Sequence, residues 1–381
     1  METDYIKADT ALCNILLCDE AKELSREAAL RRAAGIPGTW FVPAGAYIVT
    51  SPIELCSGVT MIFEDGAAVC VGKGFAGDTV FFADGFSDIS LCGGRFDAAG
   101  HVDRLFAFEN GKNLRIEKAA ARYGKSAVLI RNVRDFSLCD LMLLPDRASL
   151  DGIVLCGGEN GTIQSIRGEG ACNAGALIAL YGVEEPIERV CIRDVAALDC
   201  LRFVHIVSST VPIRDIDIRD LAGGCARGAV VVDEFSGIEK TKTDRPERAV
   251  IENITVAAAE LFCTERHKRG GDNALIRVKT PVNRFVLSDL SRPGLLDEYP
   301  RVPTFRIDGQ QKAPIFVSNI DFGQLNKMLY SGKVLIRVFS DKGFESEMRP
   351  GERLIMPDGG VGYLSIRHIC SDAERVWPNT L

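Results

Sequence analysis

Short apolar stretches, separated by Gly, Asn and Asp, follow one another from about residue 38 to residue 330. Many of them share a polar–apolar–polar–apolar pattern. The second apolar position of successive copies, two looser members included, falls at residues 91, 116, 138, 163, 192, 218, 256, 287 and 317, at intervals of 22 to 38 residues. The clearest copies are Asp88-Ile89-Ser90-Leu91, Asn113-Leu114-Arg115-Ile116, Asp135-Phe136-Ser137-Leu138, Asp215-Ile216-Asp217-Ile218 and Asn253-Ile254-Thr255-Val256.

A second, more apolar stretch lies between many copies, as in Ala127-Val128-Leu129-Ile130, Gly152-Ile153-Val154-Leu155 and Ala229-Val230-Val231-Val232. Strands that repeat at this period, with no helices between them, predict a solenoid. Two or three strands per turn with inward apolar side chains describe an all-β fold, a right-handed parallel β-helix. The alternative is one or two antiparallel sandwiches. Because a sandwich needs no steady phase over eight intervals, the pattern favours the β-helix.

The two ends of the chain depart from the repeat. Residues 19–35 carry a helical pattern that Asp19 can cap and that Gly35-Ile36-Pro37-Gly38 ends. The terminal units of a solenoid need a polar cover, so we expect this helix to shield the first turn. The sequence therefore predicts a helical cap over residues 1–38, a β-helix over 39–330, and a C-terminal β cap and tail over 331–381, with antiparallel strands near 333–338 and 362–366.

Charge and composition exclude several classes of protein. The chain has 45 Lys and Arg against 52 Asp and Glu, a net charge of −7, which argues against nucleic acid or an anionic membrane as a partner. No apolar run is long enough to span a bilayer, and the residues after Met1 show no secretory pattern. The 13 cysteines include no Cys-x-x-Cys, which favours free thiols in a reducing compartment. We therefore expect a cytoplasmic protein.

Neither a metal nor a cofactor is expected. The four histidines have no metal-binding spacing. Residues 72–77 match G-x-G-x-x-G, but the strand-like Thr79-Val80-Phe81-Phe82 follows them. Without a helix N-terminus after the glycines, this motif cannot hold a pyrophosphate, so dinucleotide binding is rejected.

Two segments carry a resemblance to known proteins. Residues 43–69 include Pro43-Ala44-Gly45-Ala46-Tyr47-Ile48-Val49 and resemble the opening turns of pectin-degrading β-helix proteins. Residues 149–166, with Leu150-Asp151-Gly152-Ile153, are similar to the first catalytic segment of polygalacturonase-like glycoside hydrolases. The resemblance implies a pectin lyase-like fold, an oligosaccharide or polysaccharide partner, and a hydrolase reaction.

The catalytic pattern of that family is only partly present. Its Asn-Thr-Asp segment reads Ser149-Leu150-Asp151, and its Asp-Asp segment falls on Cys172-Asn173-Ala174-Gly175-Ala176, without a carboxylate. The histidine segment has a partial match at His205, and the Arg-Ile-Lys segment matches Arg277-Val278-Lys279. An inverting hydrolase needs two carboxyl groups about 6.5–9.5 Å apart. Asp151 alone cannot supply both of them.

Seven residues are the candidates for a site. Asp233 and Glu234 follow an apolar strand and form the best remaining carboxylate pair, while period-two alternation places Arg277 and Lys279 on one face, where they could hold an acidic sugar. Each candidate also has a purely structural interpretation: a turn residue for Asp151, a solvated strand end for Asp233 and Glu234, and ordinary surface charge for the cations. We predict that one groove unites the catalytic candidates Asp151, Asp233 and Glu234 with the substrate-binding candidates Arg202, His205, Arg277 and Lys279.

Three function classes stay open from the sequence. The first is a glycoside hydrolase with a rearranged acid and base set. The second is an inactive β-helix that binds sugar or serves as an assembly or adhesion module. The third is a polysaccharide lyase or epimerase. The longest intervals surround residues 236–250, 261–273 and 290–304, where inserted loops would carry either a ligand cleft or the contact of a homo-oligomer.

Overall fold

The structure is a computed structural model of the 381-residue chain. It describes residues 14–15, residues 25–234 apart from 99, 101, 147–148, 170–174 and 210, residues 250–264, and residues 274–291 apart from 281. It also describes five short strands between residues 305 and 348. The predicted loops at 236–250, 261–273 and 290–304 and the predicted strand at 362–366 lie outside these residues almost entirely.

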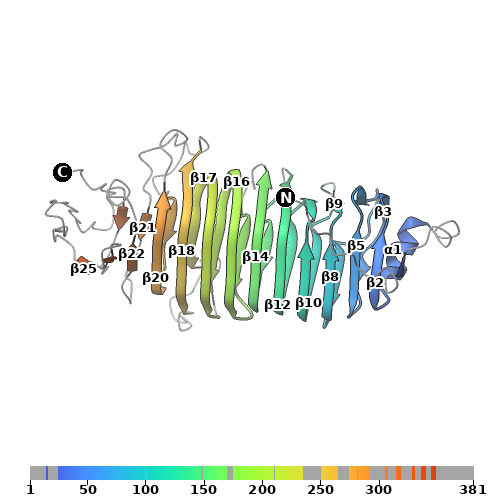
Figure 1. The fold of residues 1–381 in the computed structure, drawn as a ribbon, viewed down its shortest axis with the longest axis horizontal. Helices are drawn as coiled ribbons and strands as arrows, with labels where there is room; N and C mark the ends of the chain where they lie inside the picture. The colour runs from blue at the N-terminus through green and yellow to red at the C-terminus, as the bar shows by residue number, and fades with distance from the viewer. Residues whose placement is uncertain are drawn as a thin grey trace, which may run out of the picture.

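The chain winds as a right-handed parallel β-helix, as the repeat predicts, and its turns stack along one axis (Figure 1). Strands of successive turns pair in parallel to form three ladders. Ladder 1 contains β1 (Asn14–Ile15), β2 (Gly38–Val42), β5 (Val59–Phe63), β8 (Ser87–Cys92), β22 (Ile315–Ser318) and β24 (Ile336–Phe339). Ladder 2 contains β3 (Gly45–Val49), β6 (Ala67–Val71), β9 (Arg95–Asp97) and β11 (Ala120–Tyr123).

Ladder 3 contains β4 (Ile53–Glu54), β7 (Thr79–Asp84), β13 (Ile153–Leu155), β15 (Ile178–Gly182), β19 (Ile276–Val278), β21 (Phe305–Ile307) and β23 (Met328–Tyr330). Longer strands turn the corners and so belong to more than one ladder. They are β10 (Arg104–Glu117), β12 (Ser126–Pro145), β14 (Gly158–Glu169), β16 (Ile187–Ser208), β17 (Ile213–Glu234), β18 (Ile251–Cys263) and β20 (Val282–Ser291).

The apolar positions of the repeat form the core. In ladder 1, Leu138 pairs with Ile163, which pairs with Ile192, and the column continues to Leu287, with every member buried. Burying each such side chain contributes about 1.5–3 kcal/mol. The repeat loses one apolar position at Gly161, where a Cβ would lie 2.0 Å from Cζ of Phe136. The Phe136 ring of the preceding turn therefore fills that space.

The first polar position of the repeat turns a corner of the coil. Asp88, Asn113, Asp135, Asn160 and other residues at this position have φ near +55°, in the left-handed region that Asn and Asp tolerate best. Their side chains bond from turn to turn: Nδ2 of Asn113 donates to Oδ1 of Asp88 at 2.7 Å, and Nδ2 of Asn160 donates to Oδ1 of Asp135 at 3.1 Å. The Asp and Asn of the repeat therefore serve both backbone conformation and stacking.

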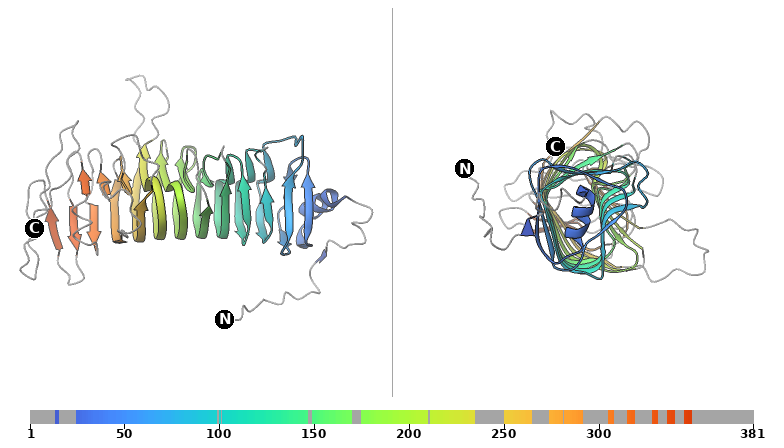
Figure 2. Two further views of the ribbon diagram at one scale, coloured as in Figure 1. Left: turned by 90° about the horizontal axis from the view of Figure 1, so that it is seen from above. Right: turned by 90° about the vertical axis from the view of Figure 1, so that its right-hand side faces the viewer.

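The N-terminal helix covers the first turn, as predicted, but it begins later. Helix α1 (Arg26–Ala34) is capped by the hydroxyl of Ser25, which accepts from the N–H of Ala28 at 3.2 Å, and not by Asp19, which lies outside the described residues. Leu30 and the alanines of its inner face are buried against the end of the core. Figure 2 shows α1 across the open end of the coil.

The coil also extends past the predicted boundary at residue 330. Strand β24 pairs in parallel with β22 and so continues ladder 1, where we expected an antiparallel cap. Antiparallel pairing begins only with β25 (Glu345–Met348), which pairs with β24.

Candidate functional site

Most of the predicted site residues lie along ladder 3. His205 of β16 is in register with Val231 of β17, which is in register with Arg277 of β19. Two residues further along the strands, Tyr181, Val207 and Asp233 form a second column. Lys279 extends this column, because it directly follows β19 and its N–H donates to the carbonyl of Val232 at 2.8 Å. Intervening residues such as Ile206 and Val232 point into the core and are fully buried.

Asp151 lies just before β13 and is the most deeply buried candidate, with 9% of its surface exposed. Its carboxylate accepts the N–H of Ala176 at 2.7 Å and the hydroxyl of Tyr181 at 2.8 Å. Burial raises the pKa of the Asp151 carboxyl above its ordinary value, against the opposing effect of these two hydrogen bonds and of the Arg202 charge. Asp151 is therefore both a structural link between turns and a carboxyl group with the raised pKa that a general acid requires.

Arg202 lies between two acidic groups. Burial, followed by the charge of Arg227, lowers the pKa of Arg202, while Tyr181, Asp151 and Asp233 act in the opposite direction. The guanidinium remains charged at any ordinary pH. The Arg202 charge therefore interacts favourably with both carboxylates, Asp151 and Asp233.

His205 is held as a neutral imidazole. Burial lowers the pKa of His205 to about 4, with the charges of Arg202 and Lys279 acting in the same direction and Asp233 against them. Its Nε2 is buried and has no hydrogen-bond partner in the described part of the chain. The ring packs edge to face against Tyr181, with 6.2 Å between centroids. A neutral imidazole among cations can accept a proton or a hydrogen bond from a ligand.

Asp233 and Lys279 form an ion pair across adjacent turns, and each is about one quarter to one third exposed. Arg277 lies two residues before Lys279 and is half-buried, in line with His205. Glu234 ends β17 in register with Ser208, and its side chain lies outside the described residues.

The structure thus brings Arg202, Asp233 and Lys279 within electrostatic reach of His205, and Asp151 within reach of Arg202. Arg277 lies in register with His205, two residues before Lys279. We call this set the ladder 3 cluster. Tyr181 joins the cluster and was missed from the sequence, where it only ends the apolar run Leu177-Ile178-Ala179-Leu180. Because side chains alternate along a strand, Tyr181 is expected to point outward next to the inward-pointing Leu180. This alternation is the sequence feature that could have identified Tyr181.

The register does not place two carboxylates at hydrolase spacing. Strands β13, β15, β16 and β17 are successive neighbours, so three turns, or about 14 Å, separate the strands of Asp151 and Asp233. An inverting pair needs about 6.5–9.5 Å between its carboxyl groups. Asp233 and Glu234 are adjacent on one strand, where side chains alternate between faces.

The described residues show neither a cluster of metal ligands nor a disulfide. They contain no group of three or more His, Cys, Asp or Glu placed to hold a metal ion. The nine cysteines that the structure describes are free thiols. Within the same residues, no helix has the length and apolar character needed to cross a bilayer.

Comparison with known proteins shows the fold. No protein-family model and no curated protein matches the sequence. Among solved structures, the endo-xylogalacturonan hydrolase from Aspergillus tubingensis is similar, with a TM-score of 0.53 and 9% identity, over 78% of this chain and 95% of that one. An iota-carrageenase complexed to iota-carrageenan fragments has a TM-score of 0.53 and 12% identity, over 70% of this chain and 84% of the other.

A third similar structure is the tailspike protein of E. coli bacteriophage HK620, solved as a double mutant in complex with a pentasaccharide. Its TM-score is 0.53 at 10% identity, over 82% of this chain and 77% of that one. The predicted likeness to pectin lyase-like β-helix proteins is therefore confirmed at the level of fold. At these identities, the likeness says nothing of which residues react.

Proposed function

We propose that this protein binds an acidic oligosaccharide across the ladder 3 cluster and cleaves it as a glycoside hydrolase. The observation that carries the proposal is a set of three cations beside Asp151, a buried carboxyl group of raised pKa. Arg202 lies on the turn of β16, and Arg277 and Lys279 lie together two turns further along ladder 3. Cations on a rigid sheet recognise carboxylate or sulfate groups. The polysaccharide-cleaving enzymes and the pentasaccharide-binding tailspike among the structures of like fold support a sugar as the ligand.

In the hydrolytic reaction, Asp151 is the candidate general acid. A general acid must be protonated at working pH, and burial pushes the Asp151 pKa in that direction. Asp233 is the candidate base, because it is the second carboxylate of the ladder 3 cluster, where it pairs with Lys279. Three turns separate its strand from that of Asp151, more than the spacing of an inverting pair, so a variant of Asp233 tests whether this residue takes part in hydrolysis.

Elimination is the second candidate reaction, and the state of His205 favours it. A lyase needs a neutral base to remove the proton beside a uronate carboxylate and a cation to neutralise that carboxylate; it does not need a second carboxyl group. His205 is neutral and lies near Arg202. The carbon–hydrogen electron pair would form the new double bond, the glycosidic oxygen would leave with its bonding pair, and an acid such as Asp151 would protonate it.

One set of measurements distinguishes these reactions. Purified protein is incubated with uronate-bearing and sulfate-bearing oligosaccharides, and reducing ends and ultraviolet absorbance are followed together. Hydrolysis produces reducing ends without absorbance, whereas elimination produces both, because the new double bond is conjugated to the carboxylate.

Variants then assign the residues. We expect Asp151→Asn to stop cleavage and keep binding, Asp233→Asn to slow hydrolysis alone, and His205→Gln to slow elimination alone. Lys279→Met is expected to weaken the binding of acidic sugars about tenfold, the effect of losing one charged contact. If no acidic oligosaccharide binds, or if Lys279→Met leaves binding unchanged, the proposal is wrong.

A further inference from the structure

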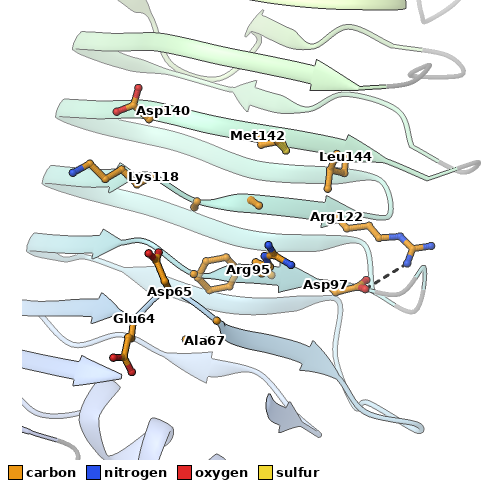
Figure 3. A pocket seen from close by; sticks show the side chains of 15 residues that line it. Glu64, Asp65, Ala67, Arg95, Asp97, Lys118, Arg122, Asp140, Met142 and Leu144 are labelled. Carbon is orange, nitrogen blue, oxygen red and sulfur yellow. Dashed lines mark hydrogen bonds and ion pairs between the residues drawn. The ribbon is translucent and has the colours of Figure 1, made fainter. Parts of the chain in front are cut away.

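A groove of about 670 Å³ lies on ladder 2, in the N-terminal half of the coil and on a different sheet from the ladder 3 cluster (Figure 3). It crosses the turns of β6, β9, β11 and the last part of β12. Four stacked strands give it a length of about 14 Å along the coil axis. Its volume lies within the range of about 300–1,000 Å³ of small-molecule sites.

The groove is hollow because small side chains alternate with long ones where the strands stack in register. One outward column of ladder 2 reads Ala68, Arg95, Ala120 and Met142 on successive turns, and the last three of these residues line the groove. Gly66 and Gly94 line the side where the strands begin. Small side chains beside long ones leave a depression that the long side chains border, and buried Phe96 lies under it.

The groove offers unpaired groups of both signs. Among the described residues, Arg95 and Lys118 form no ion pair, and neither do Asp65 and Asp140. All four are exposed. Arg122 and Asp97 pair at 3.5 Å on the opposite side, as Figure 3 shows, in a contact that a ligand can readily exchange.

An apolar strip completes the lining. Met142 is 41% exposed, and Leu144 lies two residues further along β12. A flexible thioether and an aliphatic side chain can pack against the carbon–hydrogen face of a sugar ring. The groove therefore combines an apolar strip with hydrogen-bond donors on Arg95 and Lys118 and acceptors on Asp65 and Asp140.

We propose that this groove, which we call the ladder 2 groove, is a second carbohydrate-binding site that takes a neutral oligosaccharide. Each sugar hydroxyl both donates and accepts, so neighbouring hydroxyls satisfy a cation and a carboxylate together. An acidic sugar would place its charge beside Asp65, Asp97 or Asp140, where repulsion opposes binding. In the ladder 3 cluster Asp151 is hydrogen-bonded and Asp233 is paired with Lys279, whereas Asp65 and Asp140 of this groove are exposed, so the two sites are expected to take different ligand classes. The two proposals are independent.

The first variant fills the groove and leaves its charged residues unchanged. Ala120→Trp places a large side chain at its centre. Ala222→Trp is the matched control, because Ala222 stands in the same outward column, through Met142, Arg167 and Ala196, beyond the groove. Arg95→Met is the second variant, and far-ultraviolet circular dichroism verifies the fold of each protein.

Binding is measured with an array of neutral gluco-, xylo- and galacto-oligosaccharides and of their uronate counterparts, and the neutral hits are titrated by calorimetry. We expect Ala120→Trp and Arg95→Met to weaken binding of the neutral sugar about tenfold or more, and Ala222→Trp and Lys279→Met to leave it unchanged. The proposal is overturned if no neutral oligosaccharide binds, if Ala222→Trp weakens binding as much as Ala120→Trp, or if Lys279→Met abolishes neutral binding. If the wild type binds neutral oligosaccharides but no acidic ones, the ligand proposed for the ladder 3 cluster is wrong and the proposal for this groove stands.

Discussion

His205 makes the stability of the protein depend on pH in a way that one substitution removes. The ordinary pKa of histidine is 6.5, and in the folded protein the pKa of His205 is lowered to about 4. Above pH 6.5 the imidazole is neutral in both folded and unfolded chains. As pH falls from 6.5 to about 4, the unfolded chain takes up a proton that the folded chain refuses, so the free energy of unfolding decreases.

The magnitude follows from the width of that window. At about 1.4 kcal/mol per pKa unit, the fall of the pKa from 6.5 to about 4 corresponds to about 3 kcal/mol. Burial is the largest cause of this shift. Arg202, three residues earlier on β16, and Lys279, which follows β19, oppose protonation, whereas Asp233 of β17 favours it, and the Tyr181 ring of β15 packs against the imidazole.

Urea denaturation followed by far-ultraviolet circular dichroism, at pH values between 4 and 7.5, measures this effect. The wild type and His205→Gln are compared at each pH, because the contributions of carboxylates elsewhere cancel in their difference. We expect the stability of the wild type relative to His205→Gln to decrease by about 3 kcal/mol between pH 7 and pH 4. An equal pH dependence of the two proteins would refute the burial argument for His205.

Three further predictions concern the fold. Asp151→Ala should lower the free energy of unfolding by about 1–3 kcal/mol, because the N–H of Ala176 loses its acceptor, and Asp151→Asn should lower it less, as urea titrations at pH 7 can show. Leu138→Ala should cost about 2–5 kcal/mol by opening a cavity in the stacked core, and a cost below about 1 kcal/mol would contradict that packing. Asn113→Val should cost about 1–2 kcal/mol at φ +57°, and Asn113→Gly less, when their thermal midpoints are compared.

The coil could be predicted because its signals are local and repeated. Each turn places an apolar pair such as Ile89 and Leu91 inward and an Asp or Asn such as Asp88 at a corner, so the same short pattern returns along the chain. The ends were predicted less well. Ser25 and Asp19 are both good N-cap residues, and the sequence pattern alone does not distinguish the Ser25 cap that the structure has.

The site could be predicted only in part, because strand register is not visible in a single sequence. The family resemblance and the residue types singled out Asp151, Arg202, His205 and Lys279 as candidates, and period-two alternation placed Arg277 and Lys279 on one face. Tyr181 was missed because an aromatic residue that ends an apolar run usually belongs to the core. The ladder 2 groove was missed because its hollow depends on which alanine stacks on which arginine.

The most direct test of the central proposal is a crystal structure of Asp151→Asn with an acidic oligosaccharide that the wild type binds. We expect a sugar chain lying across β15, β16, β17 and β19, with its carboxylate or sulfate groups against Arg202, Arg277 or Lys279. A sugar bound elsewhere on the coil, with the ladder 3 cluster unoccupied at saturating ligand, would contradict it.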